Sequence, residues 1–89
     1  MCIRDRLIIN RLGLHARAAS SFIQLANRFQ SDIKVSYKGQ TINGKSILGL
    51  MMLAAAKGAL ITLEIHGNDE KKAMKALKDL INNYFNEGE

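Results

Sequence analysis

The chain has 89 residues, a length that closes one modest hydrophobic core, so we expect a single domain over residues 1–89. Apolar residues make up 47% of the chain and charged residues 24%, a balance that argues against disordered and fibrous classes. The net charge of +5 suits a solvated surface, an acidic protein partner or nucleic acid, and by itself it selects none of them.

Membrane insertion is not expected, because Gly49 interrupts the most apolar segment, SILGLMMLAAAKGAL, and Lys57 and Gly58 end it. The opening MCIRDRLIIN lacks the long apolar stretch and cleavage site of a secretory signal. The single cysteine, Cys2, cannot form an internal disulfide, which agrees with a reducing compartment. We therefore expect a cytoplasmic protein.

The first predicted elements are a strand over Leu7–Ile9 and a helix over Ala16–Asn27. The strand is a short run rich in β-branched residues, and Asn10 and Gly13 end it. Residues 1–6 are treated as atypical, since their charged side chains interrupt the strand pattern. The apolar stripe of the helix follows the i, i+3, i+4, i+7 spacing: Ala19, Phe22, Ile23 and Ala26.

Alternating apolar and polar residues predict a half-buried strand over Asp32–Lys38, and a tight turn follows it. The short segment Thr41–Asn43 completes a hairpin as an edge strand. Ser46 then precedes a helical segment, Ile47–Leu53, that is apolar on nearly all sides. Part of its surface is therefore either core or a docking patch.

The segment Leu60–His66 alternates again and predicts a strand with His66 on the polar side. A last helix is expected to open at Asn68 or Asp69. The order is β-α-β-β-α-β-α, which predicts an α+β fold: an open-faced β-sandwich with a four-stranded antiparallel sheet and three helices on one face. The apolar stripe of the last helix is Ala73, Leu77, Leu80, Ile81 and Tyr84.

Most catalytic chemistries find no support in the motifs. His15, His66 and Cys2 show no metal-ligand spacing, and no nucleophile elbow occurs. The segment NGKS ends like a nucleotide-binding loop but lacks its first glycine and its spacing. We expect no metal and no cofactor.

His15 has neighbours that suit a phosphoryl group. It precedes a predicted helix, whose first N–H groups have no helical acceptor and attract anions. Arg17 adds a permanent cation with a forked geometry that matches phosphate oxygens. The local residues also fit an ordinary capping or surface histidine. Ser46 is a favoured helix N-cap, and a phosphate added there would change the charge of a neighbouring surface; the local sequence alone favours the capping role.

Two separated motifs resemble a known family. GLHARAAS at Gly13 to Ser20 and NGKSILGLMMLAAAKGALITLEIHG at Asn43 to Gly67 closely resemble HPr, the histidine-containing phosphocarriers of the bacterial phosphotransferase system. The similarity runs from about Leu7 to Phe85 and agrees with the length and the element order. Alanine stands at Ala18, where the family usually has proline; proline suits the first helical turn, and alanine should be tolerated there.

The resemblance implies a phosphoryl carrier and not an enzyme. His15 would accept the phosphoryl group on Nδ1 from phosphorylated enzyme I and pass it to an enzyme IIA component. Arg17 and the backbone amides of Ala16, Arg17 and Ala18 would stabilise the group, and Ser46 would be phosphorylated by an HPr kinase/phosphorylase. The residues expected to dock the partners are Ile47, Leu48 and Met51.

Two other functions are weighed against the carrier. An HPr-like regulatory module would act through protein contacts alone, but such a module would not need both His15 and Arg17. A nucleic-acid binder would stack bases on exposed sheet aromatics, and Tyr37 is the only aromatic residue in the predicted strands, on the face assigned to the core. We therefore expect no nucleic-acid partner and a monomeric carrier.

Overall fold

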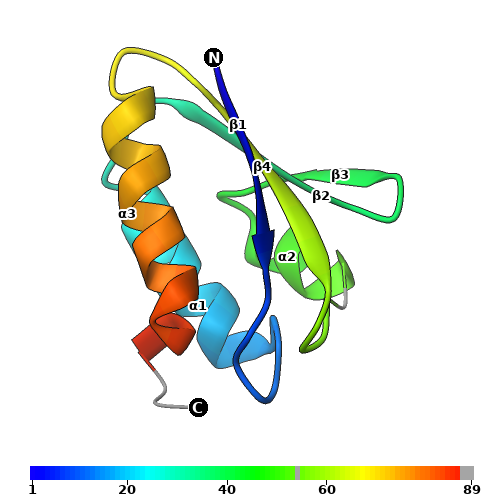
Figure 1. Ribbon diagram of the computed structural model, residues 1–89. Helices are drawn as coiled ribbons and strands as arrows, with labels where there is room; N and C mark the ends of the chain where they lie inside the picture. The colour runs from blue at the N-terminus through cyan, green and yellow to red at the C-terminus, as the bar shows by residue number, and fades with distance from the viewer. Residues whose placement is uncertain (54, 87–89) are drawn as a thin grey trace.

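The computed structural model describes residues 1–53 and 55–86 as an open antiparallel sheet that carries three helices on one face (Figure 1). The strand order is β1-β4-β2-β3, and every neighbouring pair is antiparallel. This arrangement confirms the predicted fold class. The elements are β1 (Cys2–Leu7), α1 (Ala16–Ala26), β2 (Asp32–Tyr37), β3 (Gln40–Asn43), α2 (Ile47–Leu53), β4 (Leu60–His66), α3 (Glu70–Asn82) and a 3-10 turn (Tyr84–Asn86).

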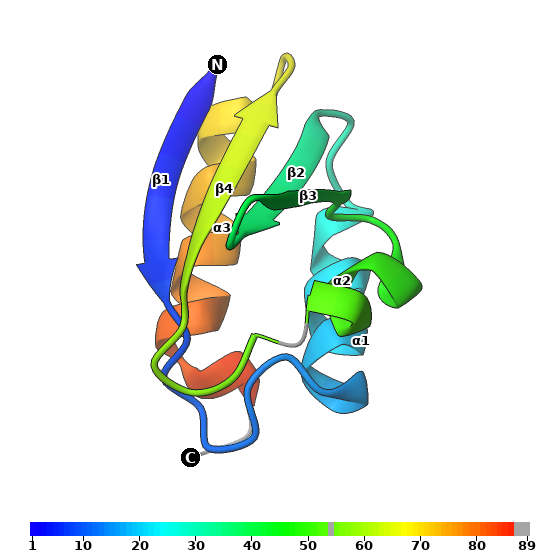
Figure 2. The same ribbon diagram turned by 90° about the vertical axis from the view of Figure 1, so that its right-hand side faces the viewer.

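Apolar and polar residues alternate along β4, so one face of the sheet is buried and the other faces solvent. Ile61, Leu63 and Ile65 are buried under the helices, while His66 on the other face is exposed. The helices add their own apolar stripes to this core, and α1 also packs against α2 (Figure 2). Within the part of the chain that the structure describes, no helix is long and apolar enough to cross a membrane.

The prediction for the first strand is wrong. The strand spans Cys2–Leu7 and pairs with β4 from Cys2 opposite Ile65 to Leu7 opposite Leu60. Charged side chains are tolerated there because β1 is an edge strand that is largely exposed. Ile8, which was expected inside the strand, lies beyond its end and is buried.

The apolar stripe predicted for the last helix is wrong at its final residue. The helix α3 ends at Asn82, and Tyr84 lies in the 3-10 turn with an exposed ring. Phe85 enters the core in its place, with a backbone φ of 53°. The left-handed backbone at Tyr84 and Phe85 reverses which side chain faces inward, and helical periodicity does not foresee this.

Asp69 ties the start of α3 to the loop between α1 and β2. Its carboxylate accepts hydrogen bonds from the N–H groups of Gln30 (2.9 Å) and Ser31 (3.0 Å), and from the Ser31 hydroxyl. The Ser31 hydroxyl, followed by the Gln30 N–H, lowers the pKa of Asp69 from its usual value of 3.8. The residue opens α3 as predicted, but its side chain fastens the loop and makes no capping bond to the helix.

The Asp69 contact predicts a specific pH dependence of stability. A lowered folded-state pKa adds stability above the unfolded pKa, and that stability is lost as the pH falls through the folded value. We expect Asp69→Asn to be less stable than wild type at pH 7 and the difference to shrink below about pH 4. Urea unfolding between pH 2 and pH 7 measures it, with Asp79→Asn on the exposed side of α3 as control. A constant difference at all pH values would contradict this assignment.

Candidate functional site

His15 is the N-cap of α1, so its ring stands at the open end of the helix. Its backbone is extended, with φ −83° and ψ −179°, and its carbonyl accepts the first intrahelical bond from the Ala19 N–H at 2.8 Å. The ring is half-buried, and Nδ1 accepts a hydrogen bond from the Arg17 N–H at 3.3 Å. An Nδ1 that accepts this bond carries a lone pair, so the proton of the neutral ring is on Nε2.

The first turn of α1 directly follows His15 and contains the other expected site residues, Ala16, Arg17 and Ala18. The N–H groups of Ala16, Arg17 and Ala18 precede the first intrahelical donor, Ala19, so helix geometry gives them no partner within α1. The Arg17 side chain is exposed, whereas the methyl group of Ala18 is fully buried. Alanine at position 18 therefore packs into the core and leaves the start of the helix intact.

The chain reaches His15 through a tightly fitted turn. Gly13 has φ +67°, and a Cβ at this position would lie 2.5 Å from the Ala55 carbonyl oxygen and 2.7 Å from the Ala56 Cα. Leu14 is buried, and its N–H donates to the same Ala55 carbonyl at 2.9 Å. Only glycine combines this backbone conformation with this close approach. The residues before His15 are therefore held by the segment that follows α2.

Ser46 caps α2 as the sequence predicts. Its Oγ accepts a hydrogen bond from the Gly49 N–H at 3.1 Å, and its carbonyl accepts from the Leu50 N–H at 3.0 Å. The side chain is half-buried. The neighbouring Lys45 directs its ammonium group to the Phe29 carbonyl at 2.7 Å, at the C-terminal end of α1.

The apolar residues of α2 divide between the core and the surface. Leu50 and Leu53 are buried, which satisfies one side of the helix. The three residues expected to dock partners are all exposed: Ile47 by 42%, Leu48 by 70% and Met51 by 43%. The sequence did not single out two further exposed apolar side chains, Met52 on α2 and Leu12 in the turn before His15.

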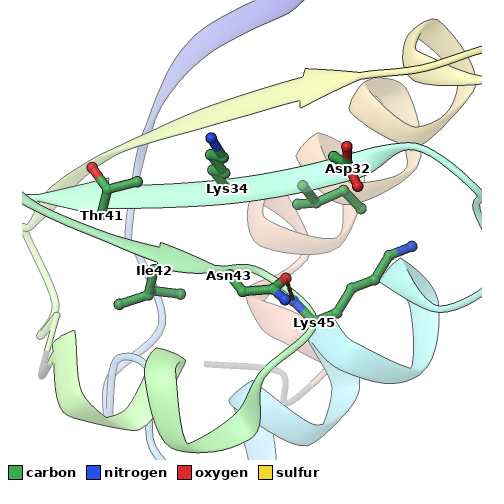
Figure 3. A pocket seen from close by; sticks show the side chains of 7 residues that line it. Asp32, Lys34, Thr41, Ile42, Asn43 and Lys45 are labelled. Atoms are coloured by element: carbon green, nitrogen blue, oxygen red, sulfur yellow. Dashed lines mark hydrogen bonds between the residues drawn. The ribbon is translucent and has the colours of Figure 1, made fainter.

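A pocket of about 400 Å³ lies at β2 and β3 and does not include His15 (Figure 3). Its polar lining mixes lysines with Asp32, so it has no single charge preference. Within residues 1–53 and 55–86, no three His, Cys, Asp or Glu side chains are grouped to hold a metal ion. The lining residues are Asp32, Ile33, Lys34, Thr41, Ile42, Asn43 and Lys45.

Sequence reasoning did not foresee the burial of Asn10, which lies three residues before Gly13. Its side chain is fully buried, and its Nδ2 donates to the Gly13 carbonyl at 2.8 Å. The available signal was a polar residue after an apolar run, and it was interpreted only as a strand end. The spacing of three residues between Asn10 and Gly13 is compatible with many turns, so it does not predict a buried amide.

A small α+β protein that presents a histidine at a helix N-terminus, beside an arginine, has the features of a phosphoryl carrier. The family model described as the PTS HPr component phosphorylation site matches residues 4–83. The chain therefore belongs to the HPr family, the phosphocarriers of the phosphotransferase system.

Individual relatives agree with this membership. The phosphocarrier protein HPr of Neisseria meningitidis serogroup A is 61% identical over 82 residues, which cover 92% of each chain. The crystal structure of HPr-C-His from Thermoanaerobacter tengcongensis is 42% identical, covers 98% of each chain and superposes with a TM-score of 0.94.

The expectation of a monomer does not match another solved relative. A structure described as an HPr dimer from Thermoanaerobacter tengcongensis is 45% identical, with a TM-score of 0.77. It covers 88% of this chain, which in turn covers 90% of it. The fold is thus compatible with self-association in a close relative.

The close approach at Gly13 predicts a large cost for an added methyl group. Gly13 and Gly39 both have positive φ, at 67° and 80°, where an L-residue costs roughly 1–2 kcal/mol. A Cβ at Gly39 meets nothing within 4 Å among the described residues, whereas at Gly13 it overlaps the backbone at Ala55. Gly13→Ala should therefore lose clearly more stability in urea unfolding than Gly39→Ala. Equal losses of stability in the two variants would contradict this prediction, because they would show that the backbone at Ala55 moves aside at no cost.

Proposed function

We propose that this chain carries a phosphoryl group on His15 Nδ1, from phosphorylated enzyme I to an enzyme IIA component. The observation that carries the proposal is the N-cap position of His15, with Nδ1 facing the Arg17 N–H. A phosphoryl group on Nδ1 would replace the lone pair that now accepts this bond. Its oxygens would then take up the N–H groups of the first helical turn, beside the Arg17 cation.

The transfer step follows from the state of the ring. The Nδ1 lone pair forms the nitrogen–phosphorus bond while the bond from phosphorus to the group on enzyme I breaks, and the electron pair of that bond stays with enzyme I. The proton remains on Nε2 throughout the step. Transfer to enzyme IIA is the same displacement with Nδ1 as the leaving atom, so the chain is regenerated and acts as a stoichiometric carrier.

The proposal predicts where label from phosphoenolpyruvate will be found. Incubation with enzyme I and labelled phosphoenolpyruvate should place one phosphoryl group on the wild-type chain, labile in acid and stable in alkali. His15→Ala should take up none, whereas His66→Ala, which removes the other histidine from the solvent-facing side of the sheet, should be labelled normally. Wild-type protein that stays unlabelled, or His15→Ala that becomes labelled, would refute the proposal.

We further propose that Ser46 is a regulatory phosphorylation site. Its hydroxyl lies at the N-terminus of α2, directly before the exposed Ile47 and Leu48. A phosphate there would add close to two negative charges at pH 7 beside this apolar surface and would alter the docking of an acidic partner.

An HPr kinase/phosphorylase supplied with labelled ATP should modify Ser46. The phosphate should be stable in acid, present in His15→Ala and absent in Ser46→Ala, which is also expected to lose about 1 kcal/mol with the helix cap. Ser20→Ala, a substitution within α1, serves as the matched control and should be labelled like wild type. Label that persists in Ser46→Ala would place the modification elsewhere.

The exposed apolar residues of α2 are proposed as the surface that docks enzyme I and enzyme IIA. The support for this role is the exposure of Ile47, Leu48 and Met51. The same short helix buries Leu50 and Leu53 in the core, so these three side chains are not needed there. Apolar side chains that stay exposed in the folded protein are available to a partner, and little conformational entropy is lost when they bind it. Leu12, in the turn that leads into His15, is also exposed.

A further inference from the structure

Among the described residues, the structure buries two polar side chains, Asn10 and Ser31. Ser31 belongs to the Asp69 contact in the loop between α1 and β2. Asn10 lies before the N-terminal end of the same helix and contacts Gly13 twice. Its Nδ2 donates to the Gly13 carbonyl at 2.8 Å, and its main-chain carbonyl accepts the Gly13 N–H at 3.2 Å.

Burial gives this turn its rigidity. Gly13 is buried and Asn10 is fully buried, so bulk water cannot readily replace the side-chain amide as donor to the Gly13 carbonyl. The two hydrogen bonds thus engage both the N–H and the carbonyl group of Gly13. They close the turn in which Gly13 has φ +67°, at a place where a Cβ would lie 2.5 Å from the Ala55 carbonyl oxygen.

The position of His15 depends on this turn. Leu14 is fixed by its own burial and by its bond to the Ala55 carbonyl, and His15 follows directly as the N-cap. The direction in which the chain leaves Gly13 therefore sets where the imidazole meets the first N–H groups of α1. We propose that Asn10 is a positioning residue for the phosphoryl-accepting ring: it acts through Gly13 and does not touch the phosphoryl group.

This inference rests on the proposed carrier function, and it predicts a loss of transfer rate. Asn10→Ala removes the donor. Asn10→Leu also removes it but keeps a branched side chain with the same number of heavy atoms, so it leaves no cavity and serves as the second variant if the alanine variant does not fold. With phosphorylated enzyme I, either folded variant should show kcat reduced by roughly ten- to a hundredfold, the scale of a small misplacement of a reacting group. KM should stay near wild type, because the exposed side chains of α2 are unchanged.

Ser31→Ala is the matched control. It removes the other buried polar side chain, which lies in the loop beyond the C-terminal end of α1. It should therefore lower the thermal midpoint without slowing transfer at a temperature where every variant is folded. A folded Asn10→Leu that transfers at the wild-type rate would overturn the proposal. A Ser31→Ala variant that slows transfer as much as Asn10→Ala would also overturn it, because general loosening of the fold would then explain both.

A second measurement is independent of phosphoryl transfer. The ¹⁵N shift of His15 Nδ1 and the hydrogen exchange of the Arg17 amide both report the bond between these two groups. Both should change in the Asn10 variants and stay unchanged in Ser31→Ala; unchanged values in the Asn10 variants would contradict positioning. If wild-type protein took no label from enzyme I, the carrier function would fail, and this measurement would still decide whether Asn10 places the ring.

Discussion

The hydrogen bond from the Leu14 N–H to the Ala55 carbonyl joins the two segments on which the candidate site depends. One segment leads from β1 into His15 and α1, and the other leads from α2 into β4. The contact continues where the Ile8 N–H donates to the Ala59 carbonyl and the Gly58 N–H donates to the Ile8 carbonyl, both at 2.8 Å. Because main-chain atoms make all these bonds, the alignment depends on backbone shape more than on side-chain identity. Two positions are exceptions: a Cβ at Gly13 would push the segments apart, and the Asn10 side chain donates to the Gly13 carbonyl.

The accuracy of the sequence predictions follows the range of the interactions that form each element. The strand β4 has the predicted bounds because its alternation of Ile61, Leu63 and Ile65 with polar residues specifies a half-buried strand locally. The helix α1 ends at Ala26, one residue before its predicted end, because its apolar stripe is also a local pattern. The first strand was predicted with the wrong bounds, because β1 forms through pairing with β4, about sixty residues away, and its own side chains are mostly charged or exposed.

The residues of the candidate site also differ in how well the sequence predicts them, according to whether their interactions are local or long-range. His15 and Arg17 could be singled out because one short motif holds both, and the resemblance supplied the role that local chemistry left open. The Ser46 cap also follows from a local preference. The contact between Gly13 and Ala55 and the burial of Asn10 could not be predicted, because they arise where two distant loops meet. No periodicity in the chain encodes such a meeting.

A carrier of the proposed kind has to present one reactive atom to two partners in turn, so it cannot enclose that atom. In this chain the His15 ring is half-buried, Arg17 is exposed, and the 400 Å³ pocket lies elsewhere, at β2 and β3. Stabilisation of the phosphoryl group must then come from donors that are already in place before the partner arrives. The helix amides meet this requirement only if the ring is held against them, and the buried Asn10 turn supplies that constraint from beneath the surface. The accessible Nδ1 of His15 and the buried side chain of Asn10 therefore act together: the first meets the partners, and the second keeps the ring at the helix amides.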